Sequence, residues 1–205
     1  MPTTIDWANR ALDKIGEKAI TSLDDGNKAA NAVKRMFAIV RDSELRKRRW
    51  SFSIKRKQLA ADATEPLFGY GFQYTMPTDC LRVLTIASID LGPDLSDYHG
   101  DGDSALYRIE GRKILYGAAG TTGTALPLRY IASIEDTTQW DACFGEAFAC
   151  KLAMELGEIL TGSDSKRQLA AAEYREALAE AQRANALELP PRQISDDSWV
   201  MARVR

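Results

Sequence analysis

Histidine is almost absent from this chain of 205 residues, in which His99 is the only one. A metal site built from several histidines is therefore excluded, and a Ser-His-Asp triad would depend on a single position. The sequence has no G-x-S-x-G elbow and no P-loop, because the glycine-rich stretch at 117–124, GAAGTTGT, lacks the Gly-Lys-Ser/Thr ending that binds phosphates. We therefore expect no catalytic residue, no bound metal and no cofactor.

The chain also has few cysteines, a small net charge and no long apolar run. Cys80, Cys143 and Cys150 cannot all pair with one another, and the last two lie about 10 Å apart along one expected helix, too far for a disulfide. We expect free thiols and synthesis in a reducing cytoplasm. The 27 Lys and Arg nearly cancel the 29 Asp and Glu, so the net charge of -2 gives no overall attraction to phosphate. No run approaches the roughly 20 apolar residues of a membrane span, so we expect no membrane partner.

Helical periodicity is present at both ends of the chain. Apolar residues recur at intervals of three and four, which predicts helices over 4–16, 27–50, 140–161 and 165–187. Pro190 and Pro191 then interrupt the helical pattern and predict an extended arm over 188–205. The residues expected to form the core of the bundle are Trp7, Phe37, Phe144, Phe148, Leu152 and Leu156.

The middle of the chain, 51–134, consists of short β-favouring runs separated by glycine and proline. In YRIEGRKILY, the residues at 110–112 stand between alternating apolar positions and predict a hairpin turn. The expected fold class is thus α+β. It is mainly a helical bundle of two N-terminal and two C-terminal helices, with an inserted small antiparallel β-sheet, in one domain over 1–187 followed by an extended C-terminal arm.

A basic run, RKRRWSFSIKRK at 46–57, contrasts with the balanced charge of the whole chain. Its first half is expected to form the C-terminal end of the second helix. There the helix macrodipole favours cations, and side chains that point outward need no partner. In its second half, Phe52 and Ile54 alternate with polar residues as in a half-buried strand. A solvated face explains the pattern, and a patch facing phosphates or an acidic partner is the next interpretation, ahead of sequence-specific DNA reading. The patch candidates, at a DNA channel or a subunit interface, are Arg46, Lys47, Arg48, Arg49, Lys55, Arg56 and Lys57.

The stretch DYHGDGD at 97–103 places Asp97, His99, Asp101 and Gly102 at the first, third, fifth and sixth positions of a calcium loop. The twelfth position, normally a bidentate Glu, is Arg108, so a polar hairpin tip is the favoured interpretation. A small hydrolase using Asp and His of this loop is the enzyme alternative.

Five short motifs occur in an order that resembles the tail tubular protein A family of tailed phages. The resemblance covers roughly 5–187. The motifs are Trp50 followed by Phe52, Leu59-Ala60, MPTDCLRV at 76–83, EGR at 110–112, and LRYI at 128–131 before the third helix. The chain departs from the family in having RKRRWSFS where a less charged, His-Pro-like approach to the Trp is common.

The resemblance implies a structural, non-enzymatic virion protein. Such a protein forms a ring, usually twelve-fold, under the portal, links the capsid to the tail nozzle protein and surrounds the DNA channel. It would be located in the virion, at the head-tail interface, and in the host cytoplasm during assembly. A DNA-binding regulator using the patch at 46–57 is the alternative function.

The C-terminal arm is expected to dock on the portal, because it combines apolar side chains with Trp and Arg, residue types that often anchor interfaces. The alternative is that the arm folds back onto its own domain. The portal-interface candidates are Ile194, Trp199, Val200, Met201, Arg203 and Arg205.

Overall fold

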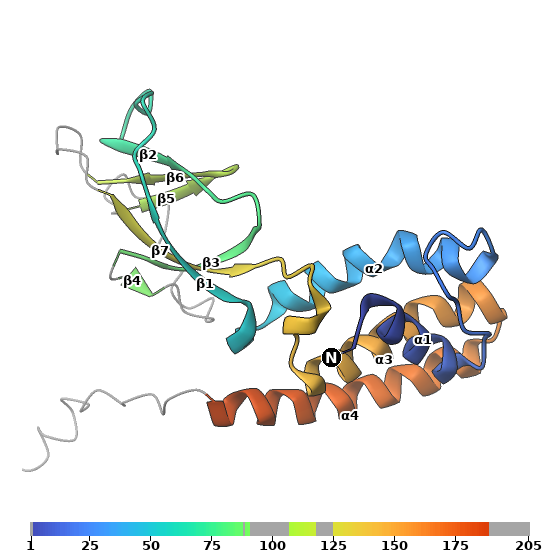
Figure 1. Ribbon diagram of the computed structural model, residues 1–205. Helices are drawn as coiled ribbons and strands as arrows, with labels where there is room; N and C mark the ends of the chain where they lie inside the picture. Colours follow the sequence, from blue (N-terminus) through green and yellow to red (C-terminus); the bar gives the residue numbers. More distant parts are fainter. Residues whose placement is uncertain (1, 88, 91–106, 118–124, 189–205) are drawn as a thin grey trace, which may run out of the picture.

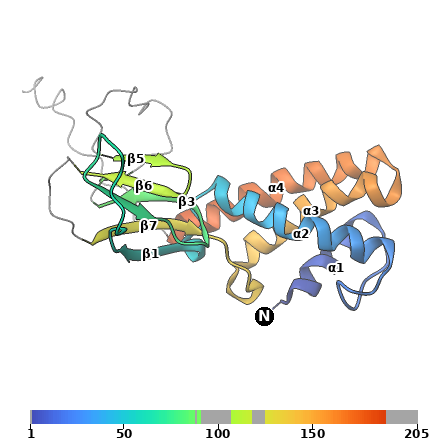
Figure 2. The same cartoon turned by 90° about the horizontal axis from the view of Figure 1, so that it is seen from above.

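The computed structural model describes residues 2–87, 89–90, 107–117 and 125–188, and in these it has a four-helix bundle beside two small antiparallel sheets (Figures 1 and 2). The expected α+β fold is confirmed. The helices are α1 (Thr4–Ile15), α2 (Lys28–Lys47), α3 (Ala142–Thr161) and α4 (Asp164–Glu188), with 3-10 turns η1 (Ser51–Ser53) and η3 (Thr137–Gln139). The strands are β1 (Ile54–Leu59), β2 (Phe72–Thr75), β3 (Cys80–Ile86), β4 (Ile89–Asp90), β5 (Tyr107–Glu110), β6 (Lys113–Tyr116) and β7 (Leu126–Ala132).

Helix α1 is capped at both ends. The Thr3 hydroxyl accepts a hydrogen bond from the backbone N–H of Asp6, whose carboxylate accepts one from the N–H of Thr3, so the first turn has a capping box. Gly16 ends the helix at φ 71°, where glycine avoids the cost of a Cβ. Lys166 of α4 donates to the Ile15 carbonyl at 2.6 Å and thereby links the two helices.

Helix α2 ends at Lys47, before the predicted end at 50, because the chain turns there to bury an aromatic side chain. Arg48 is extended, with φ -136° and ψ 163°. The Trp50 indole is 1% exposed, and its N–H donates to the Glu44 carbonyl at 3.2 Å. The predicted strand alternation through Phe52 is wrong, since 51–53 form η1 and place the Phe52 ring 5.0 Å from that of Phe144.

The other helices begin and end within two residues of the predicted positions, and their capping residues explain where. Asp141 accepts a hydrogen bond from the N–H of Phe144 at 3.0 Å, so α3 begins at Ala142, two residues after the predicted start at 140. Gly162, at φ 65°, ends α3 and allows the short connection to α4. Helix α4 exceeds its predicted range of 165–187 by one residue at each end.

The strands form two sheets instead of the single sheet that was predicted. Their orders are β1-β7-β3-β4 and β2-β6-β5. The turn predicted at 110–112 is confirmed, with Gly111 at φ 56° between β5 and β6. This hairpin pairs with β2, and Tyr74 and the facing Ile114 are both buried in the core. β4 takes the free edge of β3 in the first sheet.

The hydrophobic core runs continuously from the bundle into the sheets. All six residues predicted for the bundle core are buried, which confirms the helical register. Phe148 lies at its centre, with its ring 4.8 Å from that of Phe37 and 4.9 Å from that of Trp140. The three cysteines are free, as predicted. Among the described helices, none has both the length and the apolar character needed to cross a membrane.

Candidate functional site

The first half of the basic run binds to its own chain. Arg46 donates to the backbone carbonyl of Leu81 in β3, and Lys47 pairs with Glu44 at 2.5 Å. Arg48 contacts the side-chain amide of Gln182 in α4. The expectation that these outward side chains need no partner is therefore wrong, because the end of α2 lies where β3 and α4 meet.

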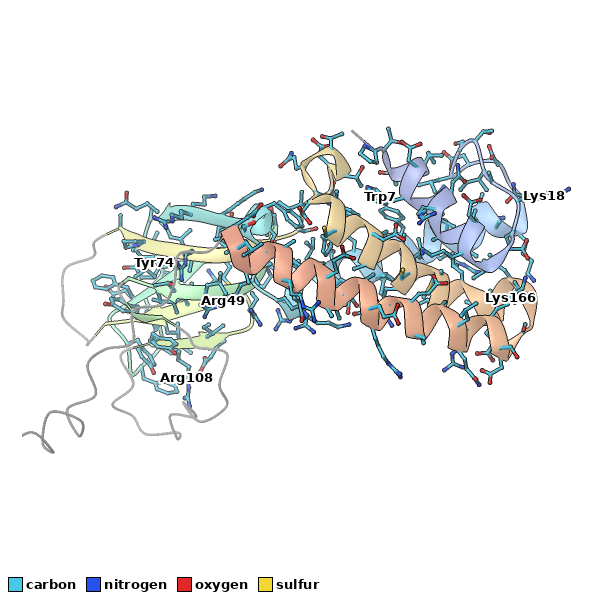
Figure 3. All side chains as sticks on the ribbon, turned by 90° about the horizontal axis from the view of Figure 1, so that it is seen from below. Trp7, Lys18, Arg49, Tyr74, Arg108 and Lys166 are labelled. Carbon is cyan, nitrogen blue, oxygen red and sulfur yellow. The ribbon has the colours of Figure 1, made fainter. Side chains whose placement is uncertain are left out.

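Arg49 follows in the extended segment after α2, close to the same meeting point of α2, β3 and α4. Figure 3 shows it where the last turns of α4 approach the strands, and the Asn185 side chain donates to its carbonyl at 3.0 Å. Arg82 of β3 is near both Arg49 and Arg46. Burial lowers the pKa of the Arg82 guanidinium, and the charges of Arg49 and Arg46 lower it further. Cations from α2, the linker and β3 are thus gathered at one place.

The second half of the run lies on β1, and its three cations have different surroundings. Lys55 pairs with Asp79 at 2.9 Å. Arg56 and Lys57 are exposed and line a groove of about 570 Å³ on the four-stranded sheet. The structure therefore does not bring the seven predicted patch residues into a single surface.

The groove on the four-stranded sheet, called the basic groove below, combines three cations with uncharged polar and apolar residues. Arg129 of β7 stands directly opposite Arg56 of β1 and, on its other side, opposite Thr85 of β3. Ala87 closes one end, with its backbone in the left-handed region at φ 52° and its N–H bonded to the Pro127 carbonyl at 2.9 Å. The lining residues that the structure describes are Arg56, Lys57, Gln58, Thr85, Ala87, Pro127, Leu128 and Arg129.

Sequence reasoning missed Arg129 and Thr85 as members of this surface. The signal for Arg129 was a single cation within the apolar strand LPLRYIA, where a buried strand would carry an apolar residue. Thr85 gave no signal, because threonine is an ordinary strand residue and only the pairing register places it beside Arg129.

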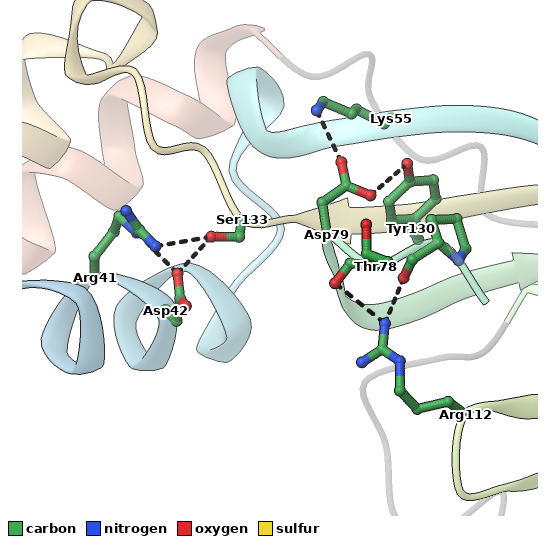
Figure 4. A network of polar contacts seen from close by, with 9 residues as sticks. Arg41, Asp42, Lys55, Thr78, Asp79, Arg112, Tyr130 and Ser133 are labelled. Atoms are coloured by element: carbon green, nitrogen blue, oxygen red, sulfur yellow. Dashed lines mark hydrogen bonds and ion pairs between the residues drawn. The ribbon is translucent and has the colours of Figure 1, made fainter.

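The two sheets and their connecting loops, called the β lobe below, are braced by polar contacts at Asp79 (Figure 4). Its carboxylate accepts from Lys55 and from the Tyr130 hydroxyl, the latter at 3.1 Å. Burial opposes ionisation of Asp79, but these two hydrogen bonds outweigh it and lower its pKa. Burial and the neighbouring carboxylate raise the pKa of Tyr130 to about 12.

Two further contacts in Figure 4 extend this bracing to the second sheet and to the bundle. Arg112 of the β5–β6 turn donates to the carbonyls of Pro77 and Thr78, the second at 3.2 Å. Arg41 of α2 donates to Ser133 at 3.1 Å, and both bind the Asp42 carboxylate. Guanidinium and hydroxyl groups thus fix the bundle and both sheets in one arrangement.

An apolar loop tip projects from the β lobe between β1 and β2. The Leu67 side chain is 98% exposed and that of Phe68 is 86% exposed. A hollow of about 330 Å³ beside them is also lined by Tyr70 and Leu115. This pair, called the apolar tip below, was missed from the sequence, although EPLFGYGF places two large apolar residues between Pro66 and Gly69.

Several predicted site residues lie outside the described part of the chain. These are the calcium-like loop at 97–103 with His99 and the portal-interface candidates at 194–205. Within the described residues, no group of His, Cys, Asp or Glu side chains is arranged to hold a metal ion. No protein-family model matches the chain, and no curated protein matches it.

Proposed function

We propose that this chain is a non-enzymatic structural virion protein, a head-to-tail adaptor of the tail tubular type. It would form a ring under the portal, link the capsid to the tail nozzle and surround the DNA channel. The virion, at the head-tail interface, would be its final location, and the host cytoplasm its place of assembly.

The observation that carries the proposal is the contact between three of the five motifs on which the resemblance rests, EGR, MPTDCLRV and LRYI. Arg112 of EGR binds the carbonyls of Pro77 and Thr78 in MPTDCLRV. In the same motif, Asp79 accepts from Tyr130 of LRYI. Trp50 closes the adjoining corner of the bundle through its hydrogen bond to Glu44. Three short motifs far apart in the sequence therefore form one structural junction, which a chance set of matches gives no reason to expect.

The shape of the molecule also supports an assembly role. The bundle and the β lobe lie end to end (Figure 1), and polar contacts hold them in a fixed orientation. The apolar tip lies on the β lobe with both side chains almost fully exposed. Exposed apolar groups on an ordered scaffold are typical of surfaces that contact another protein. Neighbouring copies, the portal and the nozzle are the partners proposed for such surfaces.

The proposal is tested by mass measurement of the purified chain, alone and mixed with portal rings of the phage that encodes it. Light scattering and negative-stain microscopy should show rings of the chain, either alone or on the portal. A chain that stays monomeric at every concentration and does not co-sediment with portal rings would contradict the adaptor role.

A DNA-binding regulator remains the second candidate, because Arg56 and Lys57 share the basic groove with Arg129. A regulator must prefer its operator, and specific sites are typically bound about 10³-fold or more tightly than non-specific DNA. Selection of duplexes from a random pool separates the two functions. Enrichment of one sequence supports the regulator, and no enrichment supports the adaptor.

A further inference from the structure

Strand β1 lies at an outer edge of the four-stranded sheet. Among the described strands only β7 pairs with it, and Figure 2 shows β1 as the last strand on that side. A strand paired on one side leaves every second backbone N–H and C=O pointing away from the sheet. β1 has six residues, against four each in β2 and β5 and two in β4, which are the other outer strands. It therefore offers the longest edge of the described sheets for a further strand.

The hydrophobic core does not extend beneath the middle of β1. Lys57 stands opposite Leu128, whose side chain points into the core and is 2% exposed, yet Lys57 itself is exposed. Lys55 is likewise exposed although the facing Tyr130 is 3% exposed. On the opposite face of the strand, Arg56 is exposed as well. A strand added beyond β1 would thus have water on both faces, so it needs polar side chains on both.

The edge also carries positive charge on both faces. Arg56 and Lys57 are neighbours in the strand and therefore point to opposite faces. Within the described part of the chain, neither forms a hydrogen bond or an ion pair. Lys55 differs, because it pairs with Asp79 at 2.9 Å. Two adjacent cations, one on each face, are thus available to a partner strand.

These charges decide which strand suits the edge. Two copies of β1 paired edge to edge would set cations opposite cations, and like charges directly opposite are destabilising. Cations on an outer strand protect in this way against pairing with a second copy. Opposite charges directly across a strand pair are stabilising, so the edge favours a strand with acidic residues facing Arg56 and Lys57.

We propose that the outer edge of β1 binds an extended acidic peptide segment of a partner protein by strand addition. Backbone hydrogen bonds to β1 hold the segment. Two consecutive carboxylates, one on each face of the added strand, pair with Arg56 and Lys57. This goes beyond the adaptor role and does not rest on it, because the edge belongs to a single copy of the chain.

The test is fluorescence anisotropy of the full chain with a short labelled peptide, in which two central glutamates are flanked by the strand-forming residues threonine and valine. The variant Arg56→Glu/Lys57→Glu places like charges opposite the glutamates and should weaken binding by about tenfold or more. The matched control, Arg175→Glu/Arg183→Glu, makes the same change of charge at exposed positions of α4. It should bind the peptide as the wild type does.

A peptide with two lysines in place of the glutamates should show the reverse order. It should bind Arg56→Glu/Lys57→Glu about tenfold or more tightly than it binds the wild type, since opposite charges again face each other. This regain also shows that the variant is folded. If the variant does not fold, Arg56→Gln/Lys57→Gln replaces it, with a loss of about threefold or more for the glutamate peptide.

Strand addition itself is tested by N-methylation of the peptide backbone, which removes a hydrogen-bond donor as proline does. Successive N–H groups of a strand point to opposite edges, so only every second one can bind β1. Of two glutamate peptides, one methylated at its odd-numbered and one at its even-numbered residues, only one should lose binding.

Four results would overturn the proposal. The first is unchanged binding of the glutamate peptide by the β1 variant, and the second is an equal loss in the α4 control. Equal effects of the two methylation patterns would show attraction by charge without strand pairing. Competition by a DNA duplex as effective as that of the glutamate peptide at equal charge would show a site for phosphate. Failure to form rings or to bind portal affects none of these measurements.

Discussion

The ring cluster of the bundle and the loop tip of the β lobe differ in the exposure of their large apolar side chains. In the bundle, Trp50, Phe144 and Phe148 are each 1% exposed and contact one another or neighbouring rings. In the β lobe, Leu67 and Phe68 are almost fully exposed. Both parts bury apolar side chains in one continuous core, and polar contacts at Asp79 brace the sheets further. The difference is that Leu67 and Phe68 form an adjacent exposed pair, whereas the exposed apolar residues of the described helices, such as Ile39 and Leu169, are separated from one another along the chain.

The sharpest test of this contrast compares two phenylalanines. Phe148→Ala removes a ring that contacts Phe37 and Trp140, and it should lower the free energy of unfolding by about 3–5 kcal/mol. Phe68→Ala removes the same atoms from an 86% exposed position and should change it by less than about 0.5 kcal/mol. Urea denaturation of both variants measures the difference. Equal losses would show that the apolar tip is structural.

Close packing inside the bundle can be tested with two glycines of α3. A Cβ at Gly145 would lie 2.1 Å from Cζ2 of Trp7, so Gly145→Ala should destabilise the fold by about 1–3 kcal/mol. At Gly157 the nearest atom, the Arg167 Cα, is 3.4 Å away, an ordinary contact. Gly157→Ala should therefore be neutral or should stabilise the helix by up to about 1 kcal/mol. Thermal melting of both variants distinguishes these signs, and a stable Gly145→Ala would contradict the tight packing.

The same contrast explains what could be predicted from the sequence. Helical periodicity is a local signal, so the bundle and all six of its core residues were identified correctly. The end of α2 was misplaced because burial of Trp50, a tertiary effect, overrides the helical pattern. Division into two sheets was missed because pairing of β6 with β2 is non-local.

The candidate site was predicted only in part, for the same physical reason. Charge density along the chain identified Arg56 and Lys57, but the other cation of the groove, Arg129, is more than 70 residues away in the sequence and joins them through strand register. Charge density also included Arg46, whose bond to the Leu81 carbonyl depends on tertiary packing, and Lys47, which pairs with Glu44 one turn earlier in α2.

Polar bracing of the β lobe predicts a dependence of stability on pH. Because the pKa of Asp79 is lower in the folded chain, its contribution is complete above the unfolded value of about 4 and is lost as the pH falls through the folded value. Asp79→Asn should cost about 1 kcal/mol at pH 7, a modest figure because the side chain is 33% exposed. At pH 3, the free energies of unfolding of Asp79→Asn and of the wild type should differ by less than they do at pH 7.

Urea denaturation at the two pH values measures this change. Asp13→Asn, on the exposed surface of α1, is the control for loss of one carboxylate outside the β lobe. A penalty for Asp79→Asn that is the same at pH 7 and pH 3 would show that its carboxylate charge does not brace the sheets.

The smallest effect on stability is expected at the apolar tip, where the effect on assembly should be largest. Leu67→Ser/Phe68→Ser replaces two exposed apolar groups with polar ones, so the free energy of unfolding should change by less than about 0.5 kcal/mol. Because exposed apolar side chains gain free energy when a partner covers them, the variant should form fewer rings or bind portal more weakly, as light scattering and co-sedimentation would show. Leu169→Ser, 58% exposed on α4, is the control for a surface apolar residue outside the tip. Unchanged assembly of the tip variant would remove the tip from the adaptor's contacts. A loss of assembly equal to that of Leu169→Ser would show that any exposed apolar residue has this effect, and that the loop has no special part in it.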